Sequence, residues 1–197
     1  MDALTQQLLQ QLSGNGLSQI SRQIGADEQA TGSALSAAVP LLVSALAKNA
    51  SKPEGAQALH QALTQDHDGS IFDDLLGFLG NPQAANGAGI LGHILGPRQR
   101  AVTKGLATGT GLKGKQIGQL LTIAAPLLMG ALGKQRQKQG FDTDGLSAFL
   151  GGQRQKVQQA NPDLMGTLNN LLDRDRDGSA ANDILGMVGR LFKRKQV

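Results

Sequence analysis

The chain has 197 residues, of which 40% are hydrophobic and only 3% aromatic, and its net charge is +4. It contains no Cys, which excludes disulfides, thiol nucleophiles and thiolate metal sites, and no Trp or Tyr. The amino terminus, MDALTQQLLQQ, has an acid and several glutamines where a secretory signal needs a basic segment and an apolar run. We therefore expect a cytoplasmic protein.

The hydrophobic pattern predicts an all-α fold, a multi-helix array with no sheet. No segment shows the sustained two-residue alternation of β-branched and aromatic residues that is typical of strands. Asp27 is expected to cap the third helix, and Pro40 in that helix and Pro126 in a later one should bend or break them. The uncharged stretches 29–47 and 116–133 are interpreted as buried core helices, so no transmembrane segment is predicted. The expected helices cover 3–12, 17–24, 28–48, 54–64, 71–80, 89–95, 98–108, 113–135, 146–158, 163–172 and 180–194.

An internal repeat gives the expected organisation of the chain. Residues 35–48, LSAAVPLLVSALAK, recur as residues 121–134, LTIAAPLLMGALGK, at a constant offset (121 − 35 = 86). Such a repeat predicts two duplicated helical units that share one compact body. The first unit is expected at 1–80, a connector rich in Asn, Gly and Pro at 81–89, and the second unit at 90–197.

Two glycine-rich fingerprints are of the G-x-G-x-x-G kind, at 87–92 and 109–114. Neither follows a predicted strand, and no Asp or Glu occurs between Asp74 and Asp142, so we reject both as dinucleotide sites and interpret them as flexible helix junctions. No familiar hydrolase or NTPase motif is present, and the histidines at 60, 67 and 93 are scattered along the chain. The sequence therefore predicts a protein that is not an enzyme.

The sharpest candidate for a metal site is DRDRDGSAAND at 173–183. Carboxylates at alternate positions followed by Gly are the pattern of a calcium loop, although Ile184 stands where an EF-hand has its bidentate acid. The alternative is an Asp-Gly turn that leads into a helix capped by Ser179, without a metal. The candidate calcium ligands are Asp173, Asp175, Asp177, the backbone carbonyl near Ser179, and Asp183.

A weaker copy of this loop, TQDHDGSIFDD, lies at 64–74. Its first position is Thr64, a poor calcium ligand, and Ser70 with Asp73 is expected to form a capping box that explains most of the copy without a metal. The fragment DTDG at 142–145 is interpreted as a turn.

The charge is distributed unevenly along the chain. Residues 75–141 carry eight Lys and Arg and no acid, which gives this stretch +8 and leaves −4 for the remainder. A basic surface of this kind can bind nucleic acid, anionic lipid or an acidic partner, and the alternative is an ordinary solvated face. The candidate polyanion-binding residues are Arg98, Arg100, Lys104, Lys113 and Lys115.

Four segments carry a resemblance to a known family: GLSQISRQIGADEQATGSALSAAVPLLVSALAKNAS, GILGHILG, TGLKGKQIGQLLTIAAPLLMGALGK and DRDRDGSAANDILGMVGRLF. With them the chain resembles the bacterial domain of unknown function 937 (DUF937) family, which includes YidB-like proteins. The resemblance implies a helical bacterial protein and brings no catalytic residue or cofactor.

The sequence thus favours a non-enzymatic binding or structural module with an unidentified protein partner and calcium as a stabiliser of the Asp-rich loop. The alternative is a peripheral factor that binds nucleic acid or an anionic membrane surface through its basic central region.

Overall fold

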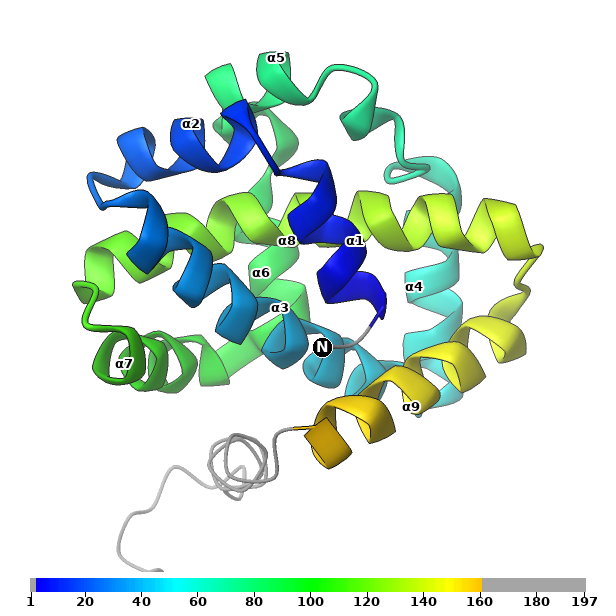
Figure 1. Ribbon diagram of the computed structural model, residues 1–197. Helices are drawn as coiled ribbons and strands as arrows, with labels where there is room; N and C mark the ends of the chain where they lie inside the picture. Colours follow the sequence, from blue (N-terminus) through cyan, green and yellow to red (C-terminus); the bar gives the residue numbers. More distant parts are fainter. Residues whose placement is uncertain (1–2, 161–197) are drawn as a thin grey trace, which may run out of the picture.

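The computed structural model describes residues 3–160, which form α-helices and short 3₁₀ helices and contain no strand (Figure 1). The predicted all-α class is confirmed for this part of the chain, and the helices expected at 163–172 and 180–194 lie outside it. The elements are α1 (Ala3–Gln11), α2 (Asn15–Ile24), α3 (Glu28–Ala50), α4 (Pro53–Gln65), η1 (Ser70–Phe72), α5 (Leu75–Gly80), η2 (Pro82–Ala85), α6 (Gly87–Leu95), η3 (Gly96–Arg98), α7 (Gln99–Thr110), α8 (Gly114–Gln139) and α9 (Thr143–Ala160).

The two long helices that contain the sequence repeat, α3 and α8, form the centre of the molecule. Every residue from 38 to 47 and from 123 to 133 is buried, so the central part of each helix is covered on all sides by its neighbours. Asp27 caps α3 as predicted, because its Oδ1 accepts a hydrogen bond of 2.8 Å from the backbone N–H of Ala30. Pro40 and Pro126 are both buried, and the helices continue through them without a break.

These same two helices are long and apolar enough to cross a membrane by length and composition. The core helix of a globular protein passes this test as well, and 72% of the most apolar window of α3 and 78% of that of α8 are buried within the fold. The finding is therefore weak evidence for a membrane span.

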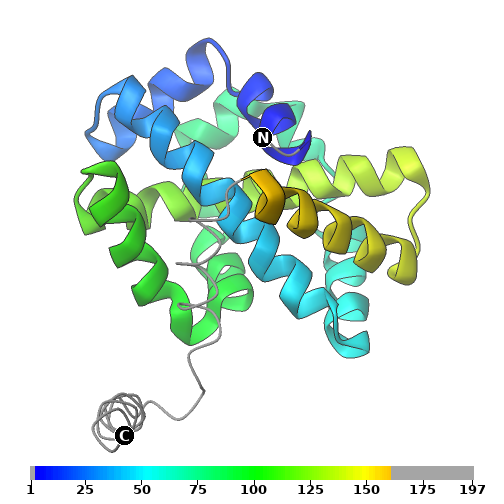
Figure 2. The ribbon, with the colours of Figure 1, turned by 60° about the horizontal axis from the view of Figure 1, so that its bottom comes forward.

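The remaining helices pack around this centre. The first helix, α1, contacts both α3 and α8, α6 lies against α8, and α9 crosses α3 (Figure 2). The hydroxyl of Ser147 near the start of α9 donates a 2.8 Å hydrogen bond to the carbonyl oxygen of Ala50 at the end of α3. One hydrophobic cluster joins the helices and includes Leu8, Leu42, Leu91, Leu128 and Leu150.

The arrangement around α3 and α8 is similar on the two sides. Before α3, α2 ends at Gly25 with φ 66°, and before α8, α7 ends at Gly111 with φ 74°, at the offset of the sequence repeat (111 − 25 = 86). In addition, α2 contacts α3 and α8, while α7 contacts α8 and α3. The contacts are compatible with a duplication, and the two-unit organisation itself stays a prediction.

Several predicted boundaries were wrong for identifiable reasons. The helix expected at 71–80 is divided into η1 and α5, because Asp74 caps α5 by accepting a 2.9 Å bond from the N–H of Gly77. The expected connector 81–89 contains η2 and the first turn of α6, so the glycine motif at 87–92 is helical and is not a flexible junction. Gly87 is needed there because a Cβ would overlap the carbonyl oxygen of Thr122 in α8.

Two other short motifs behave more simply. The motif at 109–114 joins α7 to α8 as expected. The interpretation of DTDG as a turn is wrong: Asp142 Oδ1 accepts a 2.8 Å bond from Gly145 N–H, and residues 143–145 form the first turn of α9, earlier than the predicted start at 146.

Candidate functional site

The Asp-Gly loop that follows α4 uses its carboxylates to bind the backbone. Asp68 Oδ1 accepts a 2.9 Å bond from the N–H of Ser70, and bonds to Ser70 hold the pKa of the Asp68 carboxyl below its ordinary value. The predicted capping box of Ser70 and Asp73 is wrong, because η1 follows Gly69 without a side-chain cap and Asp74 caps the next helix instead.

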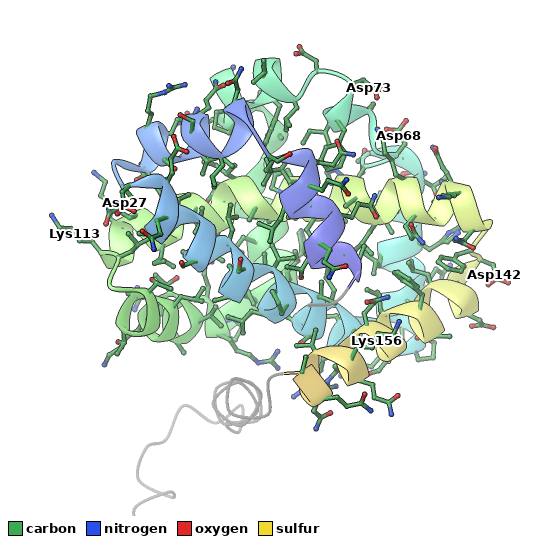
Figure 3. The ribbon with its side chains drawn as sticks, in the orientation of Figure 1. Asp27, Asp68, Asp73, Lys113, Asp142 and Lys156 are labelled. Carbon is green, nitrogen blue, oxygen red and sulfur yellow. The ribbon has the colours of Figure 1, made fainter. Side chains whose placement is uncertain are left out.

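This loop packs directly on the carboxyl-terminal half of α8 (Figure 3). A Cβ at Gly133 would overlap the carbonyl oxygen of His67, and a Cβ at Gly130 would overlap the side chain of Ile71. Lys134 completes the contact: its Nζ lies 3.4 Å from Asp73 Oδ1 and 5.3 Å from the centre of the Phe72 ring. The loop is therefore held by close packing on glycine and by a surface ion pair.

A metal site requires more ligands than this loop supplies. Within residues 3–160 no group of three or more His, Asp or Glu is placed so that it could hold a metal ion. The predicted calcium ligands Asp173, Asp175, Asp177, Ser179 and Asp183 lie outside the described residues.

A cleft of about 550 Å³ lies between α4 and α6. Its floor is formed by Leu46 of α3 and Met129 of α8, which are both buried. One wall is α4 with Leu59, and the other is α6 with Ile90. The remaining lining residues are Asn49, Gly55, Ala58, Ala62, Asp66, His67, Asn86, His93 and Ile94. An apolar floor with a polar rim is typical of sites that bind the apolar part of a ligand.

Polar groups of the rim come from three different parts of the chain. Asn49, at the end of α3, donates from Nδ2 to the carbonyl oxygens of His93 (3.2 Å) and Ile94 (3.1 Å) and thereby fixes the end of α6. Burial lowers the pKa of His67, and the nearby Asp66 carboxylate opposes part of this effect. The His67 imidazole is therefore neutral near pH 7, and Asp66 is the formally charged residue of the lining.

The sequence contains no sign of this cleft. His67 and His93 are 26 residues apart in the chain, yet the fold brings both to one rim. No local signal could have shown this, because the two residues are joined only by the packing of α4 and α6 against the central helices. The lining contains no Ser, Thr, Lys or Tyr that could act as a nucleophile.

The candidate polyanion-binding residues lie away from the cleft between α4 and α6. Arg100 and Lys104 line a groove between α7 and α8, and Lys115 lines an adjoining hollow that shares Gly118 with the groove. Lys113 precedes α8 and lies at the same end as Asp27 (Figure 3), while Arg98 ends η3. The structure thus places Arg100, Lys104 and Lys115 around one segment of α8.

No curated protein and no solved structure matches this chain significantly. Residues 6–135 match a family described as bacterial protein of unknown function (DUF937), and this range includes both copies of the repeat, the cleft and the groove. The chain therefore belongs to the DUF937 family.

Proposed function

We propose that this chain is a cytoplasmic, non-enzymatic binding module whose cleft between α4 and α6 receives an apolar side chain of a protein partner. The observation that carries the proposal is the preformed hollow of about 550 Å³ with Leu46 and Met129 at its floor. A groove between two helices with an apolar floor and a polar rim suits one anchoring side chain surrounded by polar contacts.

The charge of the cleft favours one kind of partner. Asp66 is the formally charged lining residue, and neither Lys nor Arg lines the cleft. A phosphate or carboxylate group would have no cationic partner there, whereas a Lys or Arg next to the anchoring side chain would pair with Asp66. The partner segment should therefore be apolar with a neighbouring cation.

The proposal of a binding role without catalysis rests on the composition of the lining. His67 and His93 could transfer protons, but no Ser, Thr, Lys or Tyr lines the cleft beside them. The side-chain amide of Asn49 already donates to the end of α6. The side-chain donors that could position a substrate therefore all lie at the rim of the cleft and none at its apolar floor.

A pair of matched variants tests the cleft. Ala58 is exposed on its α4 wall and Ala148 is exposed on α9, away from the cleft lining. Ala58→Arg should abolish retention of specific partners by the tagged full chain in quantitative affinity capture from the native bacterium, because the new side chain fills the cleft and adds an unfavourable charge. Ala148→Arg should retain them. Equal retention by the two variants would contradict the proposal.

The function proposed here includes calcium at the loop 173–183. Its support is the spacing of three carboxylates in the sequence, because clustered carboxylates without a cation repel one another. The first copy of the loop offers the competing explanation, since its Asp68 and Asp74 accept bonds from backbone N–H groups. A calcium titration of the full chain and of Asp175→Ala separates these explanations.

A further inference from the structure

The groove between α7 and α8 has the features of an anion-binding surface. It encloses about 770 Å³, and its lining includes the exposed cations Arg100 and Lys104 together with the hydroxyl-bearing Thr103 and Thr108. No Asp or Glu lines it. This basic groove is separate from the cleft between α4 and α6, with which it shares no lining residue.

The two cations of the basic groove repel each other. Arg100 and Lys104 are four residues apart on α7, so their side chains project from the same face about 6 Å apart along the helix axis. Like charges in this relation destabilise an isolated helix. A bound anion would relieve this repulsion, because each phosphate oxygen of a polyanion can accept from one of the cations.

Glycines of α8 leave room for a ligand beside these cations. Gly114 and Gly118 line the groove, and a Cβ added at either position would meet nothing within 4 Å. Gly118 also borders the adjoining hollow of about 670 Å³ that contains the exposed Lys115. Three cations therefore surround a segment of α8 that presents little side-chain bulk.

The surface of the described residues favours a nucleic-acid duplex over a lipid bilayer or a single strand as the source of phosphate. Among the described residues Leu76 on α5 is the exposed large hydrophobic side chain, so the groove offers nothing to insert into a bilayer. The chain has neither Trp nor Tyr, and no Phe lines the groove, so unpaired bases would find no aromatic side chain to stack on. A duplex presents its phosphates outward and needs neither kind of contact.

We propose that the basic groove binds the phosphodiester backbone of duplex nucleic acid, independently of base sequence, through Arg100, Lys104 and Lys115. Asp27 at the start of α3 lies at the same end of the molecule as Lys113 (Figure 3), and its bond to Ala30 holds it there, so its repulsion orients the duplex away from α3. The inference goes beyond the proposed partner binding and does not depend on it.

The test uses the full chain and a short fluorescein-labelled duplex DNA of arbitrary sequence, with affinity measured by anisotropy over a range of KCl concentrations. The double variant Arg100→Gln/Lys104→Gln should bind more weakly. The plot of log K against log salt should also become less steep, its negative slope shrinking in magnitude by about 1.8, since each lost phosphate contact contributes about 0.9. The matched variant Lys138→Gln/Lys156→Gln removes the same charge from exposed positions outside the groove and should leave the slope unchanged.

Two further variants separate the groove from general charge. Gly118→Gln places a neutral side chain in the groove and should weaken binding at constant net charge, whereas Gly151→Gln, at an open position on α9, should have no effect. The variant Arg190→Gln/Lys193→Gln/Arg194→Gln/Lys195→Gln removes four carboxy-terminal cations. The proposal is overturned if only this carboxy-terminal variant loses binding, or if Arg100→Gln/Lys104→Gln and Lys138→Gln/Lys156→Gln lose binding equally. It is also overturned if the chain prefers vesicles that contain phosphatidylglycerol over the duplex.

Discussion

Gly133 lies so close to the backbone of the Asp-Gly loop that no room is left for a Cβ. The carbonyl oxygen of His67 occupies the space that a Cβ would need, and backbone cannot move aside as a flexible side chain can. In the first copy of the repeat the corresponding position is Ala47 (133 − 86 = 47), so the glycine belongs to the side on which the Asp-Gly loop packs.

We therefore expect Gly133→Ala to lower the free energy of unfolding by about 1–3 kcal/mol, as overpacking does in other well-packed sites. Gly151→Ala is the control, because that position is open and helical, and the substitution should raise stability by about 0.5–1 kcal/mol. Urea denaturation of both variants measures the difference. An unchanged stability for Gly133→Ala would show that the loop does not pack as described.

His67 should make stability depend on pH. Burial lowers the pKa of its imidazole in the folded chain below the ordinary value of 6.5. Between the folded and unfolded pKa values the unfolded state binds more protons, so stability falls as the pH falls from about 6.5 through the folded pKa and is then constant. Denaturant midpoints measured across pH 7.5 to 5 should fall toward acid in the native chain and change less in His67→Gln.

A control for this effect is His60→Gln. His60 lies in α4, and its Nε2 is 3.3 Å from the carbonyl oxygen of Phe141. Its loss should leave the pH dependence attributed to His67 in place. If His67→Gln and the native chain respond to acid identically, the imidazole is not buried as the structure has it.

At the scale of the element, the turns that precede the two central helices depend on the backbone conformation of a single glycine each. Gly25 and Gly111 end α2 and α7 in the left-handed region, with φ 66° and 74°, and a Cβ at either would meet nothing within 4 Å. The cost of a side chain there is consequently one of backbone conformation alone.

Gly25→Ala and Gly111→Ala should each lower the free energy of unfolding by about 1–2 kcal/mol, the cost of placing an L-residue in the left-handed region. Gly25→Asn and Gly111→Asn should cost less, because Asn adopts this conformation more readily. Guanidinium denaturation of the four variants gives the comparison. A large difference between the two Ala variants would argue against equivalent turns and hence against a duplication.

At the scale of the whole molecule, the proposed calcium site at 173–183 predicts a stability that depends on the metal. Three carboxylates at 173, 175 and 177, without a bidentate acid at position 184, should bind calcium with a Kd on the order of 10⁻⁴ M or above. Millimolar calcium should then raise the thermal midpoint of the full chain, since a ligand that binds the folded state stabilises it.

Asp175→Ala should remove both this shift and the heat of binding in isothermal titration. Sodium chloride at equal ionic strength is the control for general screening. If calcium shifts the midpoint of Asp175→Ala as much as that of the native chain, the loop is an Asp-Gly turn with a capped helix, as in the first copy.

The sequence by itself determined the local properties of the described chain. Periodic apolar residues without two-residue alternation specify helices, because the 3.6-residue turn gathers them on one side. Asp27 caps α3 because its carboxylate needs only the first turn of the same helix. The uncharged runs around Pro40 and Pro126 identify the core helices, since so many apolar residues can be covered only in the centre.

Only the tertiary structure decided which residues far apart in the sequence lie together. The rim that joins His67 to His93, and the groove that joins Arg100 and Lys104 to Gly118, exist only because α4, α6 and α7 pack on the two central helices. The same is true of Gly87 and Gly133, which a sequence reader sees as helix-weakening residues and the fold uses for close approach of backbones. Side-chain periodicity specifies which face of a helix is buried, but it contains no information about which other helix covers that face.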